Sequence, residues 1–263
     1  IVITGDAVVN ANGGIGGGDK DEQTSITISG NAKVNATDNG RGDIDASLAV
    51  IGGGHGGTAE ITISDNAVVT AKAEVRGNLY GYYGAGAVIG GGASSRDKKS
   101  SAKVTIEGNA QVTAENYEYG GGAGIGGGAN GTGEVIIGGK AQVKATGSAE
   151  HYDQYNRYGA GAAIGDGGTA SWGQTGTVQN GENKFTTDKG IQNGAKVEMT
   201  NIGHNGPNTV TQTYKNGKWH DYQTVTVPAT CTESGYTVQK CTRCGEEGER
   251  TNLVAPLGHE YKN

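Results

Sequence analysis

Aliphatic and polar residues alternate in short runs along most of this chain, and one eleven-residue pattern, I-x-I-x-G-N-A-x-V-x-A, occurs five times. Each half of the pattern predicts a short strand with its apolar side chains on one face. The Gly, Asn or Asp residues between the halves predict a bend, because they readily adopt positive φ. The copies are Ile1–Ala11, Ile26–Ala36, Ile61–Ala71, Val104–Ala114 and Val135–Ala145, and a degenerate sixth covers Asn193–Thr200.

A second pattern, Ile-Gly-Gly-Gly, follows each copy after a gap of variable length. We expect its isoleucine to point inward and its glycines to form a corner where a side chain would collide with the neighbouring repeats. Short strands that recur with fixed corners are typical of a parallel β-solenoid, whose stacked repeats share one core. The pattern begins at Ile15, Ile51, Ile89, Ile125 and Ile164, and Asp166 replaces a glycine in the last copy.

The bend positions predict a row of similar side chains along the stack. They are Asp6, Asn31, Asn66 and Asn109, and Lys140 interrupts the series. Stacked Asn side chains can hydrogen-bond to one another along the axis, and we interpret the row in this way. Calcium binding is the alternative, but it is not supported, because calcium sites combine several carboxylates with fixed carbonyl groups.

Composition agrees with a thin fold that has few large core residues. Glycine accounts for 51 of 263 residues, and there are one Phe, one Met and two Trp. The net charge of −6 disfavours a nucleic-acid binder, which normally carries a basic patch. No apolar run is long enough for a membrane helix, so we expect no membrane insertion. The chain starts within a strand-like pattern and without Met, which indicates a fragment of a longer protein.

The variable gaps should all emerge from the same edge of the solenoid, and such insertions usually form the binding side of a repeat fold. Three of these inserts hold eight of the twelve tyrosines. Tyrosine offers a flat apolar face with a polar tip, which suits contact with a sugar ring or a protein. The alternative is that the rings pack on the thin wall in place of a core. The candidate ligand-binding residues are Tyr80, Tyr82, Tyr83, Tyr117, Tyr119, Tyr152, Tyr155 and Tyr158.

The predicted outer faces of the strands carry no candidate catalytic residues. The outward positions of the first strand are Val2, Thr27, Thr62, Thr105 and Ile136, and neither they nor those of the second strand hold a carboxylate pair. Glycoside hydrolysis needs two such groups, so we expect a non-catalytic protein. The threonines invite an ice-binding interpretation, but the second strand interrupts the regular rows with Lys, Gln and Val.

The I-x-I-x-G-N-A-x-V-x-A repeat and the GAGIGGG word resemble the right-handed parallel β-helix surface proteins of gut Gram-positive bacteria, over residues 1–211. The resemblance implies a right-handed parallel β-helix and a secreted or cell-surface location on the bacterial cell wall. Members of that family include carbohydrate-binding proteins and adhesins, and they share their architecture with pectate-lyase-like enzymes.

Residues 212–263 differ in composition and contain all three cysteines. The Cys-x-x-Cys spacing of Cys241 and Cys244 lets two thiolates bind one metal. Cys231 and His259, with His220 as the alternative fourth ligand, would complete a structural Cys3His zinc site in a unit too small to do without a staple. A disulfide with a leftover thiol is the other interpretation. The segment resembles a small Cys-containing repeat found in tandem at the ends of clostridial surface proteins.

We therefore expect an all-β chain, with a parallel β-helix over residues 1–211 and a small β-rich Cys or zinc module over residues 212–263. The expected function is non-catalytic binding of a glycan, on host mucin or plant polysaccharide, through the Tyr-rich loops. The alternatives are an adhesin for a host protein such as a receptor or immunoglobulin, a structural stalk, and a polysaccharide lyase or hydrolase.

Overall fold

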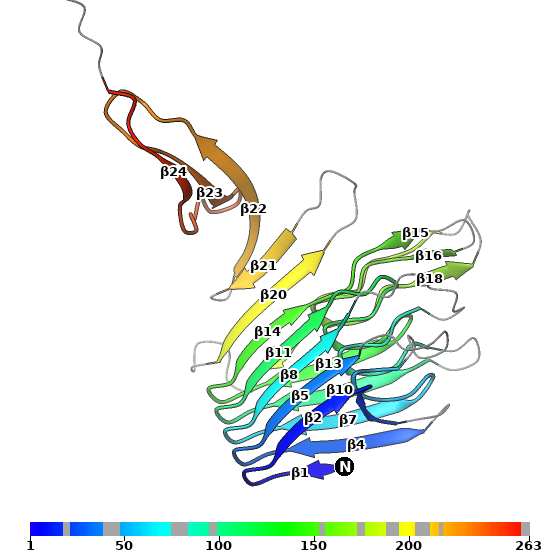
Figure 1. Cartoon of the computed structure of the whole chain (residues 1–263). Helices are drawn as coiled ribbons and strands as arrows, with labels where there is room; N and C mark the ends of the chain where they lie inside the picture. The colour runs from blue at the N-terminus through cyan, green and yellow to red at the C-terminus, as the bar shows by residue number, and fades with distance from the viewer. Residues whose placement is uncertain are drawn as a thin grey trace, which may run out of the picture.

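All elements of the fold are strands in the residues that the structure describes. The computed structural model describes residues 1–17, 22–38, 48–74, 84–94, 99–152, 156–172, 177–187, 195–202, 211–215 and 218–258, and no helix occurs among them. Most strands pair in parallel with the equivalent strand of the next repeat, which we call a coil (Figure 1). This confirms the all-β class and is compatible with a β-helix or solenoid.

Three parallel sheets run along the stack of coils. Sheet A contains β1 (Val2–Ile3), β4 (Gln23–Ile28), β7 (Thr58–Ile63), β10 (Ser101–Ile106), β13 (Thr132–Ile137) and β19 (Thr186–Thr187). Sheet B begins with β2 (Val8–Asn12), β5 (Lys33–Asp38), β8 (Val68–Ala73), β11 (Gln111–Asn116), β14 (Gln142–Thr146) and β20 (Lys196–Ile202). Sheet C contains β3 (Ile15–Gly16), β6 (Ile51–Gly52), β9 (Ile89–Gly90), β12 (Ile125–Gly126) and β17 (Ile164–Gly165).

The core is made of aliphatic side chains that alternate along sheets A and B. In-register pairing places like residues above one another, as in Val104 beside Val135 and Ile106 beside Ile137. Both strands of the fourth coil show strict alternation of buried and less buried positions. The degenerate sixth copy also joins this core, because β20 pairs with β14 and buries Val197 and Met199.

The Ile-Gly-Gly-Gly corner has the predicted geometry. The isoleucines form one column in which Ile125 pairs with Ile89 on one side and with Ile164 on the other. Gly126 has a φ of 131°, and a Cβ atom built on it would lie 2.0 Å from the carbonyl oxygen of Gly165. No side chain fits in that space, so the most linker-like segment of the sequence is a tightly constrained part of each coil.

The predicted Asn row is also confirmed. The Nδ2 atoms of Asn31, Asn66 and Asn109 each donate to the Oδ1 atom of the side chain one coil earlier, over 2.9, 3.1 and 3.0 Å. The first acceptor is the carboxylate of Asp6, and Lys140 occupies the next position after Asn109. These amides bind one another along the axis, as the structural interpretation of the row expected.

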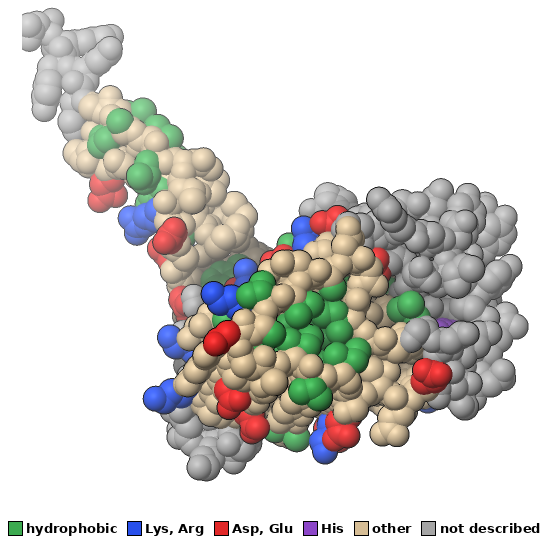
Figure 2. Space-filling view, turned by 60° about the horizontal axis from the view of Figure 1, so that its bottom comes forward, with side chains coloured by type: hydrophobic (Ala, Val, Ile, Leu, Met, Phe, Trp, Pro, Cys, Tyr) green, Lys and Arg blue, Asp and Glu red, His purple; other side chains and the backbone are tan. Residues whose placement is uncertain are grey.

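The first coil shows how much burial depends on having a neighbour on each side. Ile3 and Val9 of this coil are only partly buried, whereas Ile28 and Val34, their partners in the next coil, are buried. Figure 2, turned to bring this end of the stack forward, shows hydrophobic side chains gathered on its face. Each coil therefore owes its burial to the coils beside it, as nearest-neighbour stacking requires.

Antiparallel strands extend the structure beyond the coils. Two strands of the fifth insert, β15 (His151–Tyr152) and β16 (Asn156–Tyr158), form a small sheet with β18 (Ala170–Trp172), which follows the last isoleucine corner. Sheet B continues from β20 into β21 (Thr211–Lys215), β22 (Lys218–Val227), β23 (Gly235–Cys241) and β24 (Thr251–Val254), which project from the stack (Figure 1). Strand pairing is thus continuous across the predicted boundary at residues 211 and 212.

Within the described residues, no helix has both the length and the apolar character needed to span a lipid bilayer.

Candidate binding surfaces

The structure describes only part of the predicted tyrosine surface. Tyr117 and Tyr119 are 42 % and 40 % exposed, and Tyr158 is 1 % exposed. Tyr152 lies in β15, of which the backbone alone is described. The remaining candidates, Tyr80, Tyr82, Tyr83 and Tyr155, lie outside the described residues.

The fourth insert holds its two tyrosines outward on an ordered loop. Asn116, fully buried at the end of β11, donates from Nδ2 to the carbonyl oxygens of Gly122 and Ala123 over 3.1 and 3.3 Å. Its Oδ1 atom accepts a hydrogen bond from the backbone N–H of Glu118 over 3.0 Å. The alternation of buried and exposed positions in β11 continues into this loop, because Tyr117 and Tyr119 are exposed and Glu118, which lies between them in sequence, is buried.

Charged side chains surround the Tyr117 ring. The Nζ atom of Lys72 lies 5.2 Å from the ring centroid, within the range of a cation–π interaction, and 3.3 Å from Oε1 of Glu74. Partial burial and the neighbouring carboxylate of Glu115 raise the pKa of Tyr117 above its ordinary value. The Glu115 carboxylate also accepts a hydrogen bond from the hydroxyl, which keeps the hydroxyl protonated and leaves its oxygen able to accept a hydrogen bond from a ligand.

Tyr158 is packed in the interior and is not exposed to a ligand. It ends β16, the middle strand of the small antiparallel sheet, and its ring lies against Gly84, where an added Cβ would meet it at 3.4 Å. Tyr158 is thus a core residue, and its assignment as a ligand-binding residue is corrected by its burial.

The outer face of sheet A carries charges that the predicted strand boundaries left out. Strands β4, β7, β10 and β13 each begin three residues before the predicted repeat, because the small residues Ala59, Ala102 and Gly133 occupy inward positions and continue the alternation. The expectation that this face lacks a carboxylate pair was wrong. Glu60 and Glu134 lie on it, one on each side of Lys103.

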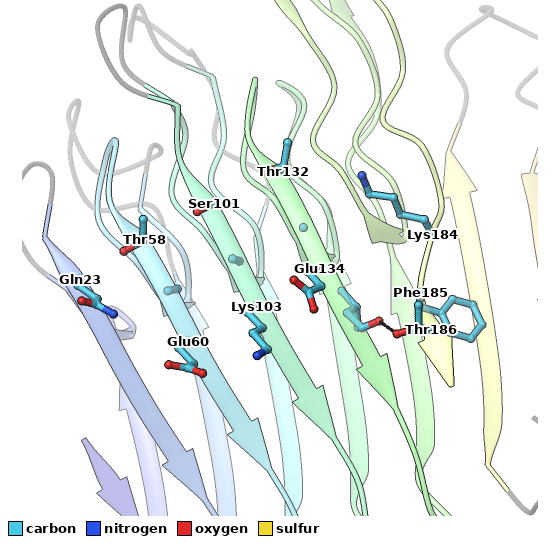
Figure 3. Close-up of a pocket in the computed structure, with 14 residues that line it drawn as sticks. Gln23, Thr58, Glu60, Ser101, Lys103, Thr132, Glu134, Lys184, Phe185 and Thr186 are labelled. Carbon is cyan, nitrogen blue, oxygen red and sulfur yellow. Dashed lines mark hydrogen bonds between the residues drawn. The ribbon is translucent and has the colours of Figure 1, made fainter. Parts of the chain in front are cut away.

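These outward side chains form rows along the stack (Figure 3). One row contains Ser25, Glu60, Lys103 and Glu134, and a parallel row contains Gln23, Thr58, Ser101 and Thr132. Except for Ser25, the residues of the two rows line an open hollow of about 710 Å³, to which Lys184, Phe185 and Thr186 also contribute. The Thr186 hydroxyl donates to the carbonyl oxygen of Val135 over 3.5 Å, which ties this end to β13.

Asp166, the one departure from the Ile-Gly-Gly-Gly pattern, supports the end of this hollow. Its Oδ1 atom accepts a hydrogen bond from the backbone N–H of Gly133 over 3.0 Å, and its Oδ2 atom lies 2.6 Å from Nζ of Lys184. Glycine at this position would offer neither contact. The substitution therefore fixes Lys184 beside β13.

The C-terminal cysteines lie near opposite ends of β23, the middle strand of the antiparallel unit β22–β24 that we call the C-terminal hairpin. Around Cys241 and Cys244 the chain makes a tight turn, in which the Gly245 N–H donates to the Cys241 carbonyl over 2.9 Å and Gly245 has a φ of 76°. Partial burial, Glu246 and then the two cysteines raise the pKa of the nearby Tyr222. Cys231 lies beyond the other end of β23, where its carbonyl accepts from the Gly258 N–H over 3.0 Å.

The cysteine turn fits two ligands of a metal, and the predicted third ligand, Cys231, lies beyond the opposite end of β23. Strand β23 runs between Cys231 and the turn and ends at Cys241, and its length is roughly 20 Å at the usual rise of a strand. Within the described residues, no three His, Cys, Asp or Glu side chains are placed to hold a metal ion. His259 lies outside them, and the side chain of His220 is not described. No disulfide links the three cysteines.

Comparison of the chain with protein-family models, curated proteins and solved structures finds no match, so its function rests on the geometry of these surfaces.

Proposed function

We propose that this chain is a non-catalytic glycan-binding protein of a bacterial surface, secreted or attached to the cell wall. The observation that carries the proposal is the pair of exposed rings, Tyr117 and Tyr119, on a loop held by the buried Asn116. Sugar rings stack on such aromatic faces, and the hydroxyl oxygen of Tyr117 can accept a hydrogen bond from a sugar hydroxyl. A loop that is already ordered loses little conformational entropy when a ligand binds.

The finer assignments belong to the same proposal. We infer a right-handed parallel β-helix for residues 1–211, supported by the three parallel sheets and by the right-handedness of nearly all parallel crossover connections. Residues 212–263 would then act as a spacer or cap. The Cys241–Cys244 turn supports a metal-binding role there only as a pair of ligands.

A protein-binding adhesin is the second candidate function. Exposed tyrosine beside Lys72, Glu74 and Glu115 also resembles a protein interface, where aromatic anchors are surrounded by a polar rim. A receptor or an immunoglobulin of the host would be the partner in that case.

A glycan array that includes mucin and plant polysaccharide structures tests the proposal, with host proteins immobilised on the same surface. The double variant Tyr117→Ala and Tyr119→Ala should lose binding by about tenfold or more, because each aromatic stack contributes on the order of 1 kcal/mol. Tyr236→Ala in the C-terminal hairpin is the matched control. Binding to host proteins alone would favour the adhesin, and silence towards all glycans would refute the proposal.

A further inference from the structure

We propose that the outer face of sheet A is a linear binding site for an extended, uncharged glycan that lies along the stack with one sugar unit per coil. This inference rests on the proposed glycan-binding function but assigns it a second surface, distinct from the tyrosine loops. The hollow of about 710 Å³ over β7, β10 and β13 defines the place (Figure 3).

The spacing of the rows favours a polymer with a short, regular repeat. Adjacent strands of a sheet lie ~4.8 Å apart, close to the length of one sugar unit in an extended chain. Because β4, β7, β10 and β13 pair in register without a bulge, each coil presents its polar side chains at the same height. A linear glycan therefore meets an equivalent pair of polar groups at every unit.

The hydrogen-bonding groups along this face match a hydroxyl-rich ligand. Thr58, Ser101 and Thr132 offer hydroxyl groups, which both donate and accept. Beside them, the carboxylates of Glu60 and Glu134 accept from sugar hydroxyls, and the ammonium group of Lys103 donates to sugar oxygens. Hydrogen bonds to charged groups are about twice as strong as those between neutral groups.

The order of charges disfavours a charged polymer. Along the stack the row reads Glu60, Lys103, Glu134, so the signs alternate from coil to coil. A polyanion would meet two carboxylates for each ammonium group, and a polycation would meet Lys103 at the centre. The ion pairs of the described residues do not involve these three side chains, which leaves them available to a ligand. The same charged row disfavours ice binding, which would require uninterrupted threonines.

The far end of the hollow is closed by a supported wall. Asp166 pairs with Lys184 and accepts from Gly133, and the half-buried Phe185 packs against the core cluster next to it. Such a wall limits the site to the coils between β4 and β19. Affinity should therefore rise with oligosaccharide length and stop rising once the ligand spans these five strands.

Titration calorimetry on the full chain tests this with defined oligosaccharides. The probes are xylohexaose and cellohexaose as neutral ligands, hexagalacturonate as the anion and chitosan hexamer as the cation, with shorter neutral oligomers for the length dependence. We expect the neutral hexamers to bind more tightly than either charged one. Ser101→Trp, which fills the hollow from an outward position, should abolish this binding, and Lys103→Ala should weaken it by about tenfold. Lys144→Ala, an exposed lysine on the outer face of β14, is the matched control and should change nothing.

The outcomes separate this inference from the function on which it rests. If glycan binding is lost in the Tyr117→Ala and Tyr119→Ala variant but survives Ser101→Trp, the inference fails and the proposed function stands. If none of the four hexamers binds, the inference of a linear glycan site on sheet A fails. Preference for hexagalacturonate or chitosan would overturn the uncharged ligand, and release of shorter sugars from xylohexaose or cellohexaose would overturn the non-catalytic role.

Discussion

The coils and the C-terminal hairpin are both built from short strands, yet they bury very different amounts of apolar surface. In the coils, small aliphatic side chains such as Val104, Ala114 and Ile125 are completely buried. In the hairpin, Val238 and Cys241 are the buried hydrophobic residues of the described part, whereas Leu253 and Leu257 are 71 % and 72 % exposed. Burial here depends less on the strand sequence than on having an identical neighbour on each side.

The two regions also differ in what holds them together. In the coils, backbone pairing on both sides is reinforced by the Asn row and by the glycine corners. In the hairpin, the Lys240–Glu247 ion pair at 3.0 Å and the stacking of Arg250 on Tyr236 at 3.9 Å are surface interactions. Exposed ion pairs contribute little to stability, so the hairpin should be the weaker part of the chain.

The largest effect is expected from adding one methyl group at the glycine corner. Gly126→Ala would place a Cβ 2.0 Å from the Gly165 carbonyl oxygen at a φ of 131°, and should cost about 4 kcal/mol or more of the free energy of unfolding. Gly91→Ala, whose Cβ would meet nothing closer than 3.6 Å, is the control. Denaturant unfolding compares them, and equal stability of the two variants would contradict a packed corner.

Truncating one aliphatic side chain in each region compares directly how much a side chain stabilises the coils and the hairpin. Ile125→Ala empties a position enclosed by two coils and should destabilise by about 2–5 kcal/mol, because it leaves a cavity. Leu257→Ala removes an exposed side chain and should change stability by less than about 0.5 kcal/mol. The comparison between regions breaks down if Leu257→Ala proves as costly as Ile125→Ala in thermal or denaturant unfolding.

The Asn row should contribute a smaller, graded amount. Asn66→Ala removes the donor to Asn31 and the acceptor of Asn109, and should cost about 1 kcal/mol. Lys140→Asn, which would extend the row by one coil, should stabilise by a similar or smaller amount. An unchanged unfolding midpoint for both variants would show that the row contributes nothing to stability.

A still smaller effect concerns the pH response of the hairpin. Lys240, and after it Arg250, lowers the pKa of Glu247 below its ordinary value. Any stabilisation from this pair is present above the ordinary carboxyl pKa and is lost as the pH falls through the lowered one. Lys240→Ala should raise the pKa of Glu247 in an NMR titration. An unchanged pKa of Glu247 in this variant would show that the ion pair with Lys240 does not lower it.

Replacing Cys231 is expected to leave the amount of metal bound by the chain unchanged. Because β23 separates Cys231 from the Cys241–Cys244 turn, Cys231→Ser should leave the metal content of the purified chain unaltered. Elemental analysis of this variant beside Cys241→Ser makes the comparison. Loss of zinc in both variants would support the predicted four-ligand site and contradict the separation of the cysteines.

The features of the fold that could be predicted from the sequence are those that recur in several coils. The isoleucine column, the glycine corner and the Asn row each recur in four or five coils, so chance similarity is averaged out and the common geometry remains. The predicted strands of sheet A began too late to include the outward residues Glu60, Lys103 and Glu134. The sequence Thr58-Ala59-Glu60-Ile61 nevertheless alternates as a strand does. Their outward position follows once Ala59, Ala102 and Gly133 are recognised as inward residues of the same alternation.

By itself, the sequence determined the repeat, the strand type, the inward isoleucines and the corners that exclude a side chain, since these depend on local periodicity and glycine conformation. The tertiary structure alone decided that Asp166 supports Lys184, that Tyr158 is buried while Tyr117 and Tyr119 are exposed, and that Cys231 lies apart from Cys241. These outcomes depend on which single residues the register of stacked strands brings side by side. Neighbours across the stack are 25 to 43 residues apart in the chain, as the Asn row shows, and no local pattern carries that information.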